Sequence, residues 1–223
     1  MAPTGDTGPL EDGLLAVDHV LLAVEDLERA AAVLNDRYGL SSAEGGRHPQ
    51  WGTANRIVPV GDAYLELIAV VDPSRTGDNT FGRWVSGASP GLLRPLGWAV
   101  RAGDIDVVAG RLDLVIESGS RATPDGRRLH WRLAGVERAA ADPALPFFIE
   151  WGPGTPHPSR LPVAHAAGTV ELLAVEVRGD PERLATWLGD SELPVIVRRG
   201  PSAITRITLA AGGREIVLES IAT

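Results

Sequence analysis

The sequence predicts an α+β fold in which tandem βαβββ modules form a curled, barrel-like mixed sheet with a cleft, followed by a third βαβββ-like module. Three observations predict it. A short apolar strand followed by an aspartate and an amphipathic helix occurs three times, each helix precedes further strand-like runs, and the aspartates Asp26, Asp104 and Asp180 are almost equally spaced. A matched pattern that returns at a long, regular interval is typical of a duplicated module.

The first copy begins with an apolar strand over residues 15–24. Asp26 suits a helix N-cap, because its carboxylate accepts the unpaired N–H groups of the first turn. Gly39 supplies the left-handed residue that ends such a helix. The buried stripe between them comprises Leu27, Ala30, Ala31, Leu34 and Tyr38. Strands over 56–60 and 63–70 follow, joined by the hairpin signal Gly61-Asp62.

The second copy has a strand over residues 96–101 and a helix capped by Asp104. The apolar residues of this helix recur at helical spacing, so one face is predicted to be buried. This stripe comprises Ile105, Val108, Ala109 and Leu112, and the later strands cover 114–117, 128–133 and 146–151.

The third copy has a strand over residues 170–177 and a helix capped by Asp180. Pro181 favours a helix start at this point, because the first helical position needs no N–H donor. The remaining signals are the stripe Leu184, Trp187 and Leu188, a stop at Gly189, and strands over 195–198, 204–210 and 215–220.

These patterns divide the chain into a flexible N-terminus, a domain of two modules and a third module. Two stretches rich in Pro, Gly and Ser, 72–95 and 152–168, are predicted to be linkers. The N-terminal stretch lacks the basic and apolar regions of a signal peptide. The boundaries are 1–13 for the N-terminus, 14–160 for the first domain with modules 14–71 and 92–152, and 166–223 for the third module.

Composition excludes several functions. The chain of 223 residues is 44% hydrophobic, enough for a buried core, and its formal net charge of −8 opposes binding to nucleic acid. All its cations are arginine and it has no cysteine, which excludes a lysine Schiff base, disulfides and thiolate chemistry. No apolar run reaches the roughly 18 residues that span a bilayer. We expect a cytoplasmic protein that binds neither nucleic acid nor membranes.

Each copy ends in a strand that carries one carboxylate among apolar neighbours: Glu66, Glu150 and Glu219. An isolated buried charge is costly, so such a carboxylate must be solvated in a cleft, paired, or bound to a metal. His19 lies in the first strand in a similar setting. Histidine and glutamate from adjacent strands suit Fe²⁺, Mn²⁺, Ni²⁺ or Zn²⁺. Alternatively, His19 satisfies a local hydrogen bond and the glutamates pair with arginine.

The segment 45–55 is dense in polar and turn-forming residues. It is a candidate substrate loop that offers hydrogen bonds and a stacking surface. It is equally a well-ordered lead-in to the next strand. The candidate substrate-binding residues of this segment are Arg47, His48, Trp51, Thr53 and Asn55.

His157, which precedes Pro158, has the same two interpretations as the segment 45–55. Structural or solvated roles are expected for His130 and His165. Aromatic side chains on the strands and near their ends are candidates for stacking a ligand in the cleft. Besides Trp51, these are Tyr64, Trp98 and Trp151.

Several motifs together resemble the glyoxalase-like members of the vicinal oxygen chelate superfamily. They are Val17-Asp18-His19-Val20, the segment 45–55, Tyr64-Leu65-Glu66-Leu67-Ile68, and the strand 146–151 followed by His157-Pro158. The resemblance covers roughly residues 15–160. It implies tandem βαβββ modules that form a curled, barrel-like sheet around a cleft, which agrees with the repeat.

The resemblance also implies where a metal would lie, because ligands in metal-binding relatives come from the first and last strands of each paired module. These positions are His19 and Glu66 in the first module, and Gly97 and Glu150 in the second. Gly97 has no donor, so His19, Glu66 and Glu150 remain, with Glu66 or Glu150 as ligand or general base. The missing ligand argues against a glyoxalase I enzyme, and a second histidine for an extradiol-dioxygenase iron site is also missing.

The leading hypothesis is a metal-assisted lyase, isomerase or dioxygenase that acts on an oxygenated metabolite. Its rival is a metal-free protein that binds or sequesters an aromatic metabolite or antibiotic, as some superfamily members do, and a third hypothesis is a catalytically silent scaffold. Paired modules make one barrel, so the third module must pack on the pair or meet a second copy of itself. Exposed strand edges favour a homodimer.

Overall fold

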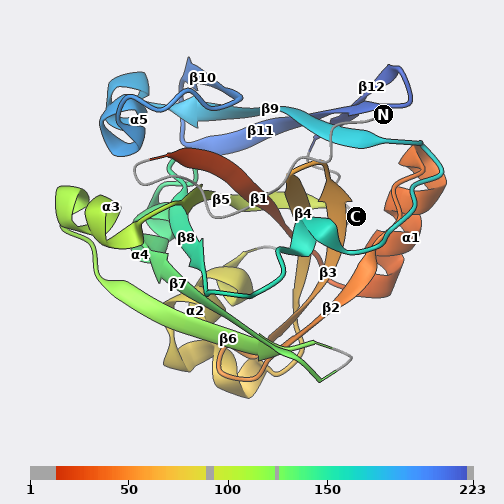
Figure 1. Ribbon diagram of the computed structural model, residues 1–223, viewed down its shortest axis with the longest axis horizontal. Coiled ribbons are helices and arrows are strands. Elements are labelled where there is room, and N and C mark those ends of the chain that lie inside the picture. Colours follow the sequence, from red (N-terminus) through yellow and green to blue (C-terminus); the bar gives the residue numbers. More distant parts are fainter. Residues whose placement is uncertain (1–13, 89–92, 124–125, 220–223) are drawn as a thin grey trace.

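The computed structural model describes residues 14–88, 93–123 and 126–219, and the predicted flexible N-terminus at 1–13 lies outside them. Two sheets build the molecule, one of eight strands and one of four (Figure 1). The larger sheet curls into a nearly closed barrel, and the smaller sheet lies over one side of it. The predicted α+β class with a barrel-like sheet is confirmed.

The first half of the barrel follows the predicted order. Asp26 accepts the N–H of Arg29 and caps the first helix, and Gly39 ends that helix in a left-handed conformation. The elements are β1 (Leu15–Ala23), α1 (Leu27–Tyr38), β2 (Ala43–His48), β3 (Thr53–Val60) and β4 (Ala63–Val70). The strand β2 was not predicted, because it contains Gly45-Gly46, but it pairs with β3.

The second half has the same topology. Its elements are β5 (Arg94–Ala102), α3 (Ile105–Leu112), β6 (Ile116–Ala122), β7 (Arg128–Ala134), α4 (Val136–Ala141) and β8 (Phe147–Trp151). Asp104 caps α3, as predicted. The strand β1 pairs parallel with β4, and β5 pairs parallel with β8 in the same way. The two halves join along the antiparallel pair β1–β5, which gives the order β2-β3-β4-β1-β5-β8-β7-β6.

The prediction that residues 72–95 form a linker is wrong for its described part. This stretch contains a 3₁₀ helix, η1 (Pro73–Asp78), and the helix α2 (Thr80–Gly87). Phe81, Trp84 and Val85 recur at helical spacing and are buried, so α2 packs against one end of the barrel. The second predicted linker contains only a short 3₁₀ helix, η2 (Pro158–Arg160).

The third copy has the predicted element order with a different strand pairing. It comprises β9 (Val170–Gly179), α5 (Pro181–Leu188), β10 (Val195–Arg199), β11 (Ala203–Ala211) and β12 (Arg214–Leu218). Asp180 caps α5 as predicted, and Ser220 of the last predicted strand lies outside the described residues. The strand order is β10-β9-β11-β12, whereas the first strand of each barrel module pairs with the fourth of its own module.

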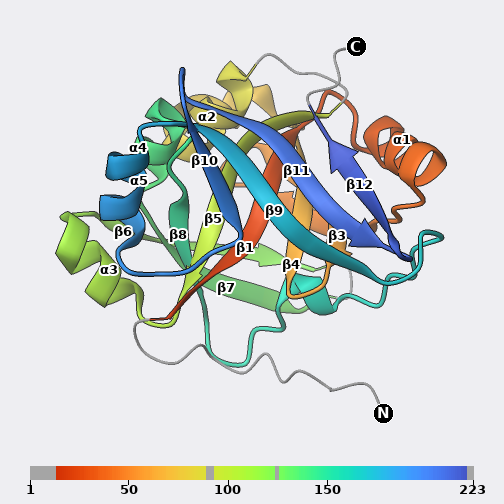
Figure 2. The same cartoon turned by 90° about the horizontal axis from the view of Figure 1, so that it is seen from above.

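The smaller sheet packs across the outer face of the barrel (Figure 2). Its buried side chains, such as Val175, Ile207 and Leu209, share one core with Val20 and Trp98 of β1 and β5. Burial of each large apolar side chain in this layer contributes about 1.5–3 kcal/mol. The third copy therefore stabilises the barrel from outside and leaves the barrel interior to the other face of β1 and β5.

Glycines allow the two ends of the large sheet, β2 and β6, to approach each other. Gly46 has a φ of 145°, and a Cβ there would lie 2.6 Å from the carbonyl oxygen of Ala122. Arg121 of β6 donates a hydrogen bond to the carbonyl of Gly45 on β2. This contact closes the barrel and places a buried arginine at the seam.

Candidate functional site

The barrel encloses a cavity with a polar side and an aromatic side. The polar side chains are His19, His48, Asn55, Tyr64, Glu66 and Arg121; the aromatic and aliphatic ones are Trp51, Phe81, Trp131, Phe147, Trp151, Ile57, Leu133 and Ile149. The free volume is about 30 Å³, room for only a few water molecules. Any larger ligand must displace side chains to enter.

A β-bulge places two polar side chains of β1 on the same side. The pairing of β1 with β5 shifts register between Val17 and His19. Strict alternation would separate the side chains of Asp18 and His19, but the bulge lets Asp18 Oδ1 approach His19 Nδ1 to 2.6 Å. His19 also stacks on Tyr64, with ring centroids 4.7 Å apart, so its ring orientation is held from two sides.

Asp18 is a fully buried carboxylate that accepts three hydrogen bonds. Besides His19, its donors are Trp151 Nε1 at 3.0 Å and His157 Nε2 at 2.9 Å. Burial alone would raise the pKa of Asp18, but the charges and hydrogen bonds of His157 and His19 hold it well below its usual range. Asp18 is therefore an anion, and Nδ1 of His19 carries the proton that it accepts.

Glu66 faces the other ring nitrogen of His19. The distance from His19 Nε2 to Glu66 Oε2 is 3.4 Å, and Glu66 Oε1 accepts a hydrogen bond of 2.6 Å from Asn55 Nδ2. Because two lone pairs would repel at this separation, one proton between Nε2 and Oε2 satisfies both atoms. Asp18, His19 and Glu66 thus form a buried acid–base system.

Arg121 supplies a cation in the same cavity. Burial lowers its pKa, while Tyr64 and Glu66 act in the opposite direction. An arginine retains its charge even so. Arg121 and the carboxyl group of Glu66 thus line one cavity, the two kinds of group that a proton-transfer reaction through an oxyanion needs.

The remaining titratable groups in the cavity are neutral. Burial, and then the charge of Arg121, lower the pKa of His48 to about 3, and His48 Nδ1 lies 3.0 Å from Thr53 Oγ1. Burial, together with the charges of Asp18 and Glu66, raises the pKa of Tyr64 well above its usual value. Both side chains act at neutral pH as hydrogen-bonding groups without charge.

The donor set does not fit the divalent metal that the resemblance implied. In the parallel strand pairing of the first module, Leu21 lies opposite Glu66. Ala99 precedes its helix cap by the same interval as Leu21 does, and it lies opposite Phe147. The second module thus presents Gly97 and Phe147 where the first presents His19 and Glu66. Only two donors face the cavity from these four positions, and Arg121 repels a further cation. The described residues contain no group of three or more His, Cys, Asp or Glu that could hold a metal ion.

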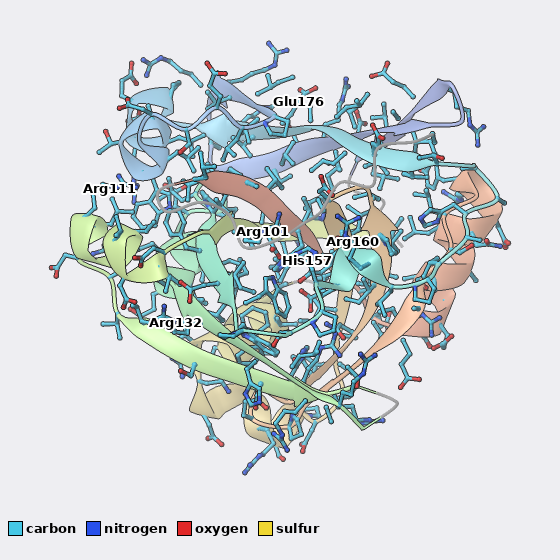
Figure 3. All side chains as sticks on the ribbon, in the orientation of Figure 1. Arg101, Arg111, Arg132, His157, Arg160 and Glu176 are labelled. Atoms are coloured by element: carbon cyan, nitrogen blue, oxygen red, sulfur yellow. The ribbon has the colours of Figure 1, made fainter. Side chains whose placement is uncertain are left out.

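Three predicted site residues lie elsewhere. Glu150 was expected in the cleft, but Oε2 accepts the N–H of Ile105 and Oε1 pairs with Arg132 at 2.7 Å. Figure 3 shows Arg132 on the α3 side of the molecule, far from His157. Arg47 is exposed on β2, and Trp98 lies in the core beneath the smaller sheet, where its Nε1 donates to the carbonyl of Ala144. None of the three faces the cavity.

The structure does bring together most of the other candidates. His19, His48, Trp51, Asn55, Tyr64, Glu66 and Trp151 line the cavity, Thr53 contacts His48, and His157 contacts Asp18. Their roles in binding or catalysis remain predictions. Asp18 and Arg121 were not among the predicted site residues. A charged residue inside an apolar strand was a usable signal for Asp18, whereas nothing around Arg121 distinguishes it from an exposed arginine.

Comparison with known proteins identifies relatives of this fold. A family model described as a glyoxalase-like domain matches residues 17–192. No curated protein matches the chain in sequence. The structure of a hypothetical protein from Staphylococcus aureus superposes with a TM-score of 0.64 at 14% identity, and the match covers 92% of this chain and 99% of that one. This coverage shows that both sheets occur together in another protein.

Methylmalonyl-CoA epimerases also match part of the chain. The enzyme from Mycobacterium tuberculosis has a TM-score of 0.44 at 19% identity and covers 62% of this chain and 88% of its own. A Streptomyces coelicolor epimerase in complex with 2-nitronate-propionyl-CoA has a TM-score of 0.43 at 14% identity and covers 62% of this chain and 94% of its own. Similarity at this level is too low to transfer an activity.

Proposed function

The chain belongs to the glyoxalase-like family of the vicinal oxygen chelate superfamily, and on this premise we propose that its barrel cavity catalyses proton transfer without a metal. The substrate is a small oxygenated anion with an acidic C–H bond next to a carbonyl group. The observation that carries the proposal is the buried Glu66, which lies 3.4 Å from His19 in a cavity that also contains Arg121. Buried ionisable groups that converge in one cavity are typical of functional sites.

The proposed step uses these three side chains. Glu66 takes the proton from the carbon atom, and the electron pair of the broken C–H bond moves toward the carbonyl oxygen. Arg121 stabilises the resulting oxyanion, because its charge lies in a water-poor cavity. Asp18 holds His19 as the protonated neighbour of Glu66. Return of a proton to carbon, from Glu66 or from His19, completes an isomerisation.

Proton exchange with solvent tests the proposal. Pyruvate, 2-oxobutyrate and acetoacetate are incubated in ²H₂O with the protein, and loss of the proton signal next to the carbonyl group is followed by nuclear magnetic resonance. We expect wild-type protein to accelerate exchange of at least one probe and Glu66→Gln to slow that exchange by about 100-fold or more, the usual contribution of a general base. Treatment with EDTA should leave the rate unchanged.

Glu219→Gln is the matched control. Glu219 directly follows β12 of the smaller sheet, outside the barrel, and pairs with Arg206. It should exchange at the wild-type rate. No acceleration with any probe, an undiminished rate in Glu66→Gln, or a rate lost with EDTA and restored by a divalent metal would each refute the proposal.

A specific observation favours a second candidate, a binding or sequestration protein for an aromatic metabolite. Trp51, Phe81 and Trp131 pack side by side in the cavity, with centroid distances of 4.5 and 5.9 Å. Aromatic faces of this kind stack a planar ligand well. Tight binding of an aromatic compound without proton exchange would support this function instead.

A further inference from the structure

A second pocket lies directly outside the seam of the barrel, between β2, the β6–β7 hairpin and η2. Its free volume is about 360 Å³, many times that of the inner cavity. Arg121 lines both spaces, and His157 lines the outer pocket while its Nε2 contacts Asp18. The outer pocket therefore adjoins the acid–base system at two residues. His157 and Arg160 enter it from the segment around η2 (Figure 3).

The charge of this pocket is opposite to that of the molecule. The chain has a formal net charge of −8, but the described lining carries three arginines, Arg121, Arg127 and Arg160, and one carboxylate, Glu44. Arg160 also pairs with Asp62 at 3.2 Å, an exposed ion pair at the rim. Exposed pairs of this kind are weak, so an anion in the pocket competes with Asp62 at little cost.

The other walls of the pocket are apolar. Leu129 is buried, and Leu161 and the prolines Pro156, Pro158 and Pro162 surround it. An apolar wall beside guanidinium groups fits a ligand that combines a hydrocarbon or aromatic body with a negative charge. Guanidinium groups bind carboxylates and phosphates alike, because both present paired oxygen atoms to the planar donor fork.

We propose that this outer pocket binds the anionic, non-reacting part of the substrate, a carboxylate or phosphate carried on an apolar body. The inference rests on the proposed function and extends it. The free volume of the inner cavity, about 30 Å³, holds only a few water molecules, so only a small reacting group can pass Arg121 toward Glu66. The rest of the molecule stays in the outer pocket, where its binding energy positions the reacting end.

Calorimetric titration with simple probes tests this binding site separately from the chemistry. The probes are phenyl phosphate, benzoate and phenol, at one fixed low ionic strength. We expect at least one of the two anions to bind wild-type protein at least tenfold more tightly than phenol. The ratio between phenyl phosphate and benzoate identifies whether the pocket prefers phosphate or carboxylate. Arg160→Gln and Arg127→Gln should each weaken the preferred anion about fivefold or more.

Arg206→Gln is the matched control and should bind the probes as wild type does. Arg206 is an exposed arginine on β11 that pairs with Glu219. Equal binding of phenol and the anions, no binding to folded wild-type protein, or equal weakening by Arg206→Gln would overturn the inference. Glu66→Gln should retain probe binding. Probe binding without proton exchange would therefore refute only the proposed function, and exchange without probe binding would refute only the outer pocket. Circular dichroism confirms that each variant is folded.

Discussion

At the scale of single residues, the buried His48 links the cavity to the pH dependence of stability. Its pKa is about 3 in the folded protein and 6.5 in the unfolded chain. As the pH falls below 6.5, His48 becomes protonated in the unfolded chain but stays neutral in the folded protein. The free energy of unfolding therefore decreases by about 1.4 kcal/mol per pH unit until the pH approaches 3. The lowered pKa of Asp18 acts in a lower window, below about pH 4.

We expect His48 to cause about 2 kcal/mol of the stability lost between pH 7 and pH 5, and His48→Gln to lack that part of the loss. Urea unfolding at the two pH values measures it. His130→Gln, at an exposed position of β7, is the control and should keep the wild-type difference. An identical pH dependence in His48→Gln and wild type would contradict the assignment.

The positions of individual site residues were only partly predictable. Alternation along β4 put Glu66 on the face of Tyr64 and Ile68, and all three lie inside the barrel. The bulge in β1, which turns Asp18 toward His19, depends on pairing with β5 and leaves no local signal. Glu150 was assigned to the cleft by its place in the chain, but the register of β8 puts Ile149 inward and Glu150 outward.

At the scale of elements, α2 occupies the place where a fourth metal ligand would project. A Cβ on Gly97 of β5 would lie 2.3 Å from the ring of Trp84. The indole can pack on the strand only because that residue is glycine. We expect Gly97→Ala to lower the free energy of unfolding by about 1–3 kcal/mol through overpacking.

A double-mutant cycle separates this contact from a general effect on β5. Trp84→Ala alone should cost about 3–5 kcal/mol. In the double variant the clash is absent, so the combined loss should fall short of the sum by at least about 1 kcal/mol. Gly110→Ala in α3 is the control, because no heavy atom lies within 4 Å of its added Cβ, and it should stabilise the protein by about 0.5–1 kcal/mol. Additive losses would show that Trp84 and Gly97 do not interact in this way.

Elements were predicted correctly where the residues that specify them lie close together in the sequence. The three helices with aspartate caps were predicted because cap, stripe and stop lie within one segment. The strand β2 was missed because Gly45 and Gly46 are selected by close approach: a Cβ on Gly45 would lie 2.1 Å from Asn55 Oδ1. The helix α2 was missed because it is short and sits among Gly, Ser and Pro, and its stability comes from packing against the barrel.

At the scale of the whole molecule, the third copy is a cover for the barrel. Its element order was predicted. Its strand order was not, because the pairing of strands depends on which face of the sheet is buried against the barrel. None of the described helices is long and apolar enough to cross a bilayer. The inner face of the smaller sheet is buried against β1 and β5, so any contact with a second copy must use the outer face or the strand edges.

The outer face of the smaller sheet is the surface on which the predicted homodimer is best tested. Leu173, Ile196 and Val217 are exposed apolar side chains from β9, β10 and β12. A stable interface buries about 800 Å² on each partner and needs an apolar centre of this kind. Nearby charges such as Arg206 and Glu219 would form a polar rim.

We expect sedimentation at tens of micromolar to show a dimer, and Ile196→Lys or Val217→Lys to convert it to a monomer, because each buries a charge at the centre of the interface. Val71→Lys introduces the same charge at an exposed apolar residue after β4 and should leave the dimer intact. A wild-type monomer at high micromolar concentration would refute the dimer. A dimer that withstands both lysine substitutions would instead place the interface on the strand edges.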